Sequence, residues 1–126
     1  MFRGVGIDIV DIDRISKMVE NYGHQFLEKI YTLSEIEWCS RKAFSATHYA
    51  GRWAAKEAFY KALPDHLQPL SGWKSIQVLP NADGRRPIID VCDDGLKGEL
   101  QREFIHMFHL SISHEKSHCA AIVILE

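Results

Sequence analysis

The chain has 126 residues, of which 46% are hydrophobic and 25% are charged, and its formal net charge is −2. This length suits a single hydrophobic core, so we expect residues 1–126 to form one domain. The slightly negative charge argues against a nucleic-acid partner, and the lack of a long apolar run or a secretory signal argues against a membrane or secreted protein. Three cysteines without paired spacing favour a reducing cytoplasm.

The first expected element is a strand over Val5–Asp11. Its aliphatic residues Val5, Ile7 and Ile9 recur at every second position, so we expect them to face the core and Asp8 to face the other way. A carboxylate in an apolar strand needs a partner, because an isolated buried charge is costly. That partner is either an Arg or Lys side chain in the core or a bound cation.

A helix follows this strand, capped by Asp11 or Asp13 and running to about Asn21. Arg14 lies in its first turn, where a cation gains nothing from the helix dipole. We therefore expect Arg14 to serve either packing or contact with an acidic partner. Further along, Thr32–Glu35 has the pattern of a capping box, which predicts the start of another helix.

The central prediction is a helix of about four turns over Tyr49–Leu63, ended by Pro64. Trp53, Glu57 and Lys61 recur every four residues and therefore share one face of this helix. Such a Glu–Lys pair is usually an exposed ion pair of small effect. The alternative is that this stripe lies at the edge of the core and holds a metal and a phosphate.

The second half of the chain predicts two hairpins and one helix. The turn at Asp83-Gly84 joins the first two strands, and Arg85 and Arg86 follow it, where adjacent arginines are either solvated or frame a phosphate. The last strand is apolar throughout, so we expect it to be buried on both faces. Together the elements predict an α+β fold, a small, mainly antiparallel sheet with helices packed on it. The expected ranges are strands at Trp73–Leu79, Pro87–Cys92, His106–Ser113 and Cys119–Leu125 and a helix at Asp94–Ile105.

One candidate centre of chemistry pairs Asp8 with Glu57. Two converging carboxylates repel each other unless a cation lies between them. Hard oxygen ligands favour Mg²⁺, which commonly also binds substrate phosphates. Lys61, one turn beyond Glu57, would then meet the same phosphates.

Two weaker candidates lie near the C-terminus. His114, His118 and Cys119 have a spacing that suggests zinc, although their segment has the pattern of a turn entering a strand. Ser111, Ser113 and His114 form a possible hydrolase set, but the sequence shows neither a nucleophile elbow nor an acidic partner for the histidine.

Two segments of the chain are distinctive, the N-terminal GIDIVDIDRI and the central GRWAAKEAFYKAL. They resemble the two motifs of the holo-(acyl-carrier-protein) synthases, the small 4'-phosphopantetheinyl transferases. The segments FLEKIYTLSEIEWC and SISHEKSHCAAIVILE are also similar, so the resemblance covers nearly the whole chain. It implies a Mg²⁺-dependent transfer of 4'-phosphopantetheine from coenzyme A to a serine of apo acyl carrier protein, with release of adenosine 3',5'-bisphosphate. It also implies a cytoplasmic homotrimer of fatty acid and lipid biosynthesis, with active sites between subunits.

The resemblance implies roles for the residues of the two motifs. Asp8 and Glu57 would be metal ligands, and Lys61 would contact the pyrophosphate, so that Glu57 and Lys61 are the catalytic candidates. Arg14 matches an arginine that faces the acidic carrier protein. Either Glu57 or a metal-bound water would accept the proton of the carrier serine.

The resemblance also implies a binding site for coenzyme A. Arg52 and His114 lie where the family contacts the phosphates, and the loop with Arg85 and Arg86 is similar to the one that borders the adenine. The family usually has one basic residue in that loop, so either arginine here could approach the nucleotide. Glu115 stands where the family commonly has Thr, and an acid there would repel a phosphate.

Two other functions use some of the same residues. A nucleotide pyrophosphohydrolase would deliver water in place of a serine, but such enzymes tend to carry ExxE pairs, which the central helix lacks. A non-catalytic module that binds a nucleotide or an acidic protein would need the arginines but would not need Asp8 to face Glu57.

Overall fold

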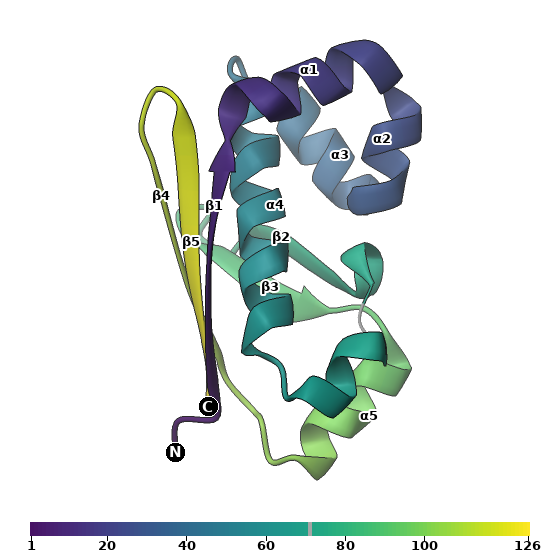
Figure 1. Cartoon of the computed structure of the whole chain (residues 1–126), viewed down its shortest axis with the longest axis vertical. Helices are drawn as coiled ribbons and strands as arrows, with labels where there is room; N and C mark the ends of the chain where they lie inside the picture. The colour runs from purple at the N-terminus through teal and green to yellow at the C-terminus, as the bar shows by residue number, and fades with distance from the viewer. Residues whose placement is uncertain (71) are drawn as a thin grey trace.

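Helix α4 (Ser45–Ala62) forms the centre of the computed structural model, which describes residues 1–70 and 72–126. It packs on a three-stranded sheet on one side and on shorter helices and a two-stranded hairpin on the other (Figure 1). The predicted helix over Tyr49–Leu63 is confirmed, but it begins one turn earlier. Phe44 stands at its N-cap, and its side chain has no oxygen to accept a capping hydrogen bond. The sequence therefore carries no signal for the start of the helix there.

The remaining elements confirm the α+β fold and correct the expectation of a single sheet. In residues 1–70 and 72–126 the strands pair antiparallel throughout and form two sheets, ordered β1-β5-β4 and β2-β3. Within the same ranges, none of the helices is both long and apolar enough to cross a bilayer. The elements are β1 (Gly4–Asp11), α1 (Ile12–Tyr22), α2 (His24–Ile30), α3 (Leu33–Ser40), β2 (Ile76–Pro80), β3 (Pro87–Val91), α5 (Asp94–Arg102), β4 (Phe108–His114) and β5 (His118–Leu125).

Local signals placed several boundaries correctly and missed others. Asp11 caps α1 by accepting the backbone N–H of Asp13, and the Thr32–Glu35 capping box is present at α3. The expected strand start at Trp73 was wrong, because Trp73–Ser75 forms a 3-10 turn ahead of β2. Helix α5 also ends earlier than expected, before Phe104, whose φ of 58° lies in the left-handed region.

Strand β1 lies directly on α4 because two glycines form its inner face. A Cβ atom at Gly4 would collide with the carbonyl oxygen of Ala62, and one at Gly6 would collide with that of Ala58. The strand backbone therefore approaches the helix backbone closely, which only glycine permits at these positions. The next inward-facing residue of β1 after these glycines is Asp8, which is thereby placed beside the C-terminal half of α4.

The predicted orientation of β1 was wrong. Val5, Ile7 and Ile9 point away from α4 and are 50%, 65% and 68% exposed, whereas Asp8 is on the helix side and half-buried. Alternation correctly indicated a strand, but the glycines allow the contact with α4 to form on the less hydrophobic face. Large aliphatic side chains could not fit so close to the helix.

The aliphatic side chains of β1 continue across the sheet and form what we call the outer sheet face: Val5, Ile7, Ile9, Ala120, Ile122 and Ile124. The register pairs Ile7 with Ile122 and Val5 with Ile124. The expectation that the last strand is buried on both faces was also wrong, because Ile122 is 37% exposed. Figure 1 shows the three strands along the left side of the molecule, with α4 and the other helices to their right.

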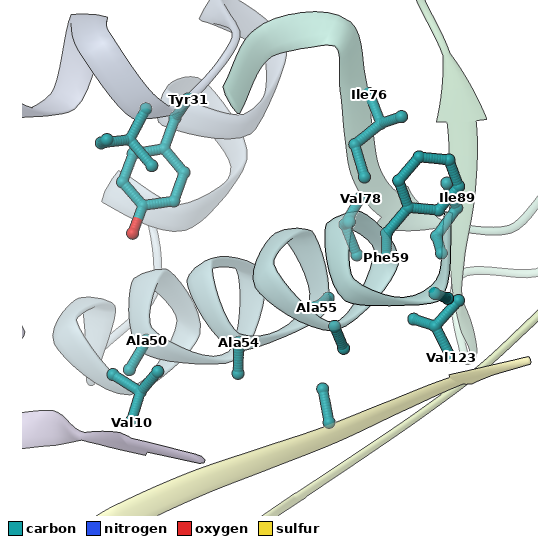
Figure 2. Close-up of a cluster of buried hydrophobic side chains, with 14 of the residues drawn as sticks. Val10, Tyr31, Ala50, Ala54, Ala55, Phe59, Ile76, Val78, Ile89 and Val123 are labelled. Carbon is teal, nitrogen blue, oxygen red and sulfur yellow. The ribbon is translucent and has the colours of Figure 1, made fainter. Parts of the chain in front are cut away.

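The hydrophobic core surrounds α4 and joins both sheets. Figure 2 shows Val10 and Val123 from the three-stranded sheet on one side of the helix and Ile76 and Val78 from β2 on the other. Small residues such as Ala54 fill the sheet side, and Phe59 fills the hairpin side. The core therefore fixes α4 relative to both sheets, which carry the candidate site residues.

The close approach of β1 to α4 makes the inner glycines sensitive to substitution. We expect Gly6→Ala to lower the free energy of unfolding by about 2 to 3 kcal/mol, because the added methyl group forces the strand off the helix. Gly98→Ala on α5 is the control, and we expect it to be neutral or stabilising, because its Cβ would meet only the end of the Arg102 side chain. Urea unfolding of the three proteins measures this, and equal stabilities would contradict the described packing.

Candidate active site

An acidic cluster lies where β1 meets the C-terminal half of α4. Lys61 Nζ is 3.0 Å from Asp8 Oδ1 and also donates to the carbonyl oxygen of Ile7 at 3.2 Å. Lys61 thus forms its ion pair with Asp8 on the strand. An ordinary exposed pair within the helix would instead join Lys61 to Glu57. The structure brings together the three motif residues Asp8, Glu57 and Lys61.

The electrostatics of this cluster show that its two carboxylates are close. Partial burial raises the pKa of Glu57, and the negative charge of Asp8 raises it further. The positive charges of Lys61 and Arg14 act in the opposite direction, which also places Arg14 within reach of the cluster. Two repelling carboxylates at the surface of a helix are a donor set that suits Mg²⁺, because a divalent cation would relieve the repulsion.

A basic cavity of about 780 Å³ lies between the N-terminal half of α4, the β2–β3 loop and the ends of β4 and β5. Its wall brings together Arg52, Arg85 and His114, for which the family resemblance implies one binding site. Arg86 follows in the same loop and is exposed. The turn has the expected geometry, because Gly84 has a φ of +76°. Besides these, the charged or titratable lining residues are His48, Glu115, Lys116 and Cys119.

Arg52 is held rigidly at the cavity wall. Its Nε donates to the carbonyl oxygen of Val78 at 3.1 Å, and its guanidinium lies 4.2 Å from the centre of the Trp38 ring. Lys42 Nζ also lies 4.4 Å from the centre of that ring. Two cations thus lie on one indole, which is an electron-rich surface for them. Burial lowers the pKa of Arg52, yet guanidinium stays protonated in proteins.

The direction in which the pKa of His48 is shifted indicates that the cavity is electropositive. Its ring packs edge-on against Trp38 with the ring centres 5.1 Å apart. Partial burial lowers the pKa of His48, and the nearby charges of Arg52, Lys42 and His114 lower it further. A cavity in which cations already repel one another attracts an anion.

The acidic cluster and the basic cavity lie on different sides of α4. Asp8 belongs to β1, at one edge of the three-stranded sheet, whereas His114 belongs to β4 at the other edge, with β5 between them. Arg52 and Glu57 are five residues apart on α4, so their side chains diverge by about 140° around the helix axis. One chain therefore presents two separate groups of candidate residues, the acidic cluster and the basic cavity, which we call half-sites.

The weaker candidates do not converge. His118 is exposed while Cys119 is buried, because neighbouring strand residues point to opposite faces, and the Cys119 thiol donates to the carbonyl oxygen of Thr47 at 3.5 Å. Ser111 and Ser113 are exposed on the same side of the sheet as the outer sheet face. The zinc and hydrolase hypotheses thus find no support in this geometry of the described residues.

Three residues near the sites were missed in the sequence. Trp38 and His48 form cavity walls, and their helices gave no sign of which face would meet the hairpin. Lys56 is 2% exposed. A signal for Lys56 was available, because it shares a helix stripe with Arg52 and follows two alanines, Ala54 and Ala55, that indicate a buried segment.

Known proteins are similar to this chain in sequence and in fold. The chain matches the family model of the 4'-phosphopantetheinyl transferase superfamily over residues 4–123. It is 40% identical over 126 residues to the holo-[acyl-carrier-protein] synthase of Syntrophus aciditrophicus, covering 100% of this chain and 97% of that one. The synthase of Halothermothrix orenii is 41% identical over 127 residues, with 100% and 98% covered.

Solved structures of holo-[acyl-carrier-protein] synthases are similar to this chain in fold. The holo-[acyl-carrier-protein] synthase of Neisseria meningitidis is similar with a TM-score of 0.84 and 28% identity, covering 100% of this chain and 99% of that one. The Bacillus anthracis synthase, in complex with CoA (3',5'-ADP), has a TM-score of 0.78 and 32% identity, with 99% and 96% covered.

Titration of His48 tests the electrostatics of the basic cavity. We expect Arg52→Met to raise the pKa of His48, because one of the positive charges that disfavour the imidazolium is removed. Lys42→Met should shift the pKa of His48 in the same direction but less. NMR titration of the His48 ring protons measures both, with Arg102→Met on α5 as a control that leaves the value unchanged. A lower pKa of His48 in either cavity variant would refute the arrangement.

Proposed function

The chain belongs to the 4'-phosphopantetheinyl transferase superfamily, and from this premise we propose that it transfers the 4'-phosphopantetheine of coenzyme A to a serine of apo acyl carrier protein, releasing adenosine 3',5'-bisphosphate. The full-length identity of about 40% to holo-[acyl-carrier-protein] synthases carries this proposal. The family match over residues 4–123 supports one catalytic domain over 1–126. Such a role belongs to cytoplasmic fatty acid and lipid synthesis.

We propose that Asp8 and Glu57 hold Mg²⁺ and that Lys61 contacts the pyrophosphate of coenzyme A. When bound, the cation would neutralise negative charge that builds on the leaving phosphate. Lys61 is tethered to Asp8 at 3.0 Å, so its ammonium adds a point charge at the same place. The carrier serine must lose its proton, and the Glu57 carboxylate, which lies beside Asp8 and Lys61, is the proposed acceptor.

The basic cavity is the proposed site for the nucleotide of coenzyme A. Arg52 and His114 would bind its phosphates, because they line a cavity in which positive charges repel one another. Arg85 lines the same cavity, so we assign the nucleotide contact in the loop to Arg85 and an outer, solvated position to Arg86. Glu115 also lines the cavity, where its carboxylate must either point away from the phosphates or bind another group.

We propose that three copies assemble through the outer sheet face. Monomeric proteins rarely expose a contiguous aliphatic patch of this kind, which includes Ile7 and Ile122. Assembly would bring the acidic cluster of one subunit to the basic cavity of its neighbour and so join the two half-sites. Arg14, exposed in the first turn of α1 near Glu57, is then available to an acidic carrier protein.

The transfer reaction is tested by intact-mass spectrometry of an apo acyl carrier protein incubated with this protein, coenzyme A and Mg²⁺. We expect a mass gain of one phosphopantetheine that EDTA abolishes. Asp8→Asn should lower the rate by a factor on the order of 100 or more, because a ligand of the cation is lost. Asp90→Asn, an exposed carboxylate on β3, is the control and should keep the rate. An unchanged rate in Asp8→Asn would refute the proposed metal role of this carboxylate. No mass gain from a folded protein that binds coenzyme A would favour the non-catalytic binding module.

The assembly is tested by light scattering coupled to size-exclusion chromatography. We expect a trimer for the unmodified chain and a folded, inactive monomer for Ile7→Lys, because a charge on the outer sheet face cannot be buried without a partner. Leu33→Lys is the control, since Leu33 is 72% exposed and lies on α3.

Subunit mixing separates trimer formation from shared sites. Asp8→Asn and Arg52→Met subunits should each be weakly active alone. A refolded mixture should recover part of the activity, because some sites then combine an intact Asp8 with a neighbour's intact Arg52. A trimer whose mixture recovers nothing would refute active sites shared between subunits.

A further inference from the structure

A buried ion pair lies in the layer between α3, α4 and the β2–β3 hairpin. Lys56 Nζ is 2.8 Å from Glu35 Oε1, and the two residues are 2% and 0% exposed. The ammonium also donates to the carbonyl oxygens of Trp73 at 2.6 Å and Ile76 at 2.8 Å. All three donors of the lysine are therefore used. The mechanism proposed above uses neither residue.

Glu35 is equally well satisfied. Its Oε1 accepts the backbone N–H of Thr32 at 2.9 Å, as part of the capping box, and its Oε2 accepts the backbone N–H of Val78 at 2.8 Å. One carboxylate thus joins the start of α3, the middle of α4 through Lys56, and β2. Such a connection fixes three segments relative to one another.

Charged side chains replace a third strand at the free edge of the hairpin. Within residues 1–70 and 72–126, strand β2 pairs with β3 on one side only. On the other side, Ile76 offers its carbonyl oxygen to Lys56, while Val78 donates its N–H to Glu35 and accepts from Arg52 Nε at 3.1 Å. Figure 2 shows Ile76 and Val78 over α4 at this edge. We call Glu35, Lys56 and Arg52 the edge clamp.

Stability alone does not account for the buried pair. Removing two charges from water is costly, and apolar residues of similar size often stabilise a protein as much or more. Burial lowers the pKa of Lys56, which reflects this cost. What a hydrophobic contact would not supply is a fixed register between α4 and the backbone of β2, because packing is not directional.

That register determines the width of the basic cavity. The hairpin supplies one wall, including Pro80, Arg85 and Pro87, and α4 supplies the opposite wall, including His48 and Arg52. Lys56 lies one turn beyond Arg52 on the same helix, and Val78 lies two residues before Pro80 on the same strand. A shift of the hairpin along α4 would therefore move Arg85 relative to Arg52.

We propose that Glu35 and Lys56 are positioning residues that hold the hairpin in register with α4, so that Arg52 and Arg85 converge on the phosphates of the nucleotide. This inference rests on the proposed function, because it assigns the cavity to the nucleotide. The pair acts through Arg52 and the hairpin loop and does not touch the substrate itself.

The test measures nucleotide binding and stability separately in Glu35→Gln, Lys56→Met and the double variant. Each single change leaves a charge buried without its partner, so both should be less stable than the unmodified protein. The double variant removes both charges and should regain most of that stability. The control is the double variant Glu99→Gln with Arg102→Met, which removes an exposed ion pair on α5.

Binding is measured by calorimetric titration with adenosine 3',5'-bisphosphate, well below the melting temperature of each variant. We expect the dissociation constant to rise about tenfold or more in both single variants and in the double variant, because misplaced groups lose affinity steeply. In transfer assays the KM for coenzyme A should rise by a similar factor, with kcat at saturating coenzyme A within about threefold of normal.

The double variant separates positioning from stability. If the pair only stabilises the fold, binding recovers together with stability in the double variant, and the inference is overturned. Normal binding in the folded single variants overturns it as well. If the unmodified protein neither transfers phosphopantetheine nor binds adenosine 3',5'-bisphosphate, the proposed function fails instead. Should a single variant not fold, the double variant still decides the inference.

Discussion

The backbone contact between β1 and α4 is the constraint on which the rest of the structure depends. Gly4 and Gly6 let the strand lie against the carbonyl groups of Ala62 and Ala58, where any side chain would collide. The same contact places Asp8 beside Glu57 and Lys61, and it turns the aliphatic face of the strand outward. The acidic cluster and the outer sheet face thus both result from this one contact between β1 and α4.

Different faces of helix α4 carry different candidate site residues, because each face packs against a different part of the fold. Its C-terminal half meets β1 and carries Glu57 and Lys61, whereas Arg52 points to the hairpin and the basic cavity. A substrate that carries both a pyrophosphate and a nucleotide, as proposed, would have to contact both half-sites. If copies of the chain associate through the outer sheet face, as proposed, each copy would supply the half-site that its neighbour lacks.

Sequence reasoning succeeded where a pattern has one physical cause. The four-residue spacing of Trp53, Glu57 and Lys61 located the helix stripe, and the resemblance to a known family paired it with Asp8. It failed for the face of β1, because alternation cannot tell which face is inner when glycine allows closer packing than an aliphatic residue. It also predicted only the capping role of Glu35 and not its ion pair with Lys56, because a carboxylate that satisfies a local motif gives no indication of a lysine far along the chain. The five-residue spacing of Arg52 and Glu57 indicates that they diverge around the helix, but only the tertiary structure shows that Asp8 and His114 lie at opposite edges of the sheet.

The ion pair between Lys61 and Asp8 means that the site carries its own tethered cation. A divalent ion would have to compete for Asp8 with the Lys61 ammonium, which is always at high local concentration. The affinity of the divalent ion for the free protein would therefore be weakened. A pyrophosphate would give Lys61 another anion to bind and would free Asp8 for the ion. Cation and substrate would then strengthen each other's binding by the same factor, as thermodynamic linkage requires. Lys61 would thereby make the site selective for the pair over either one alone.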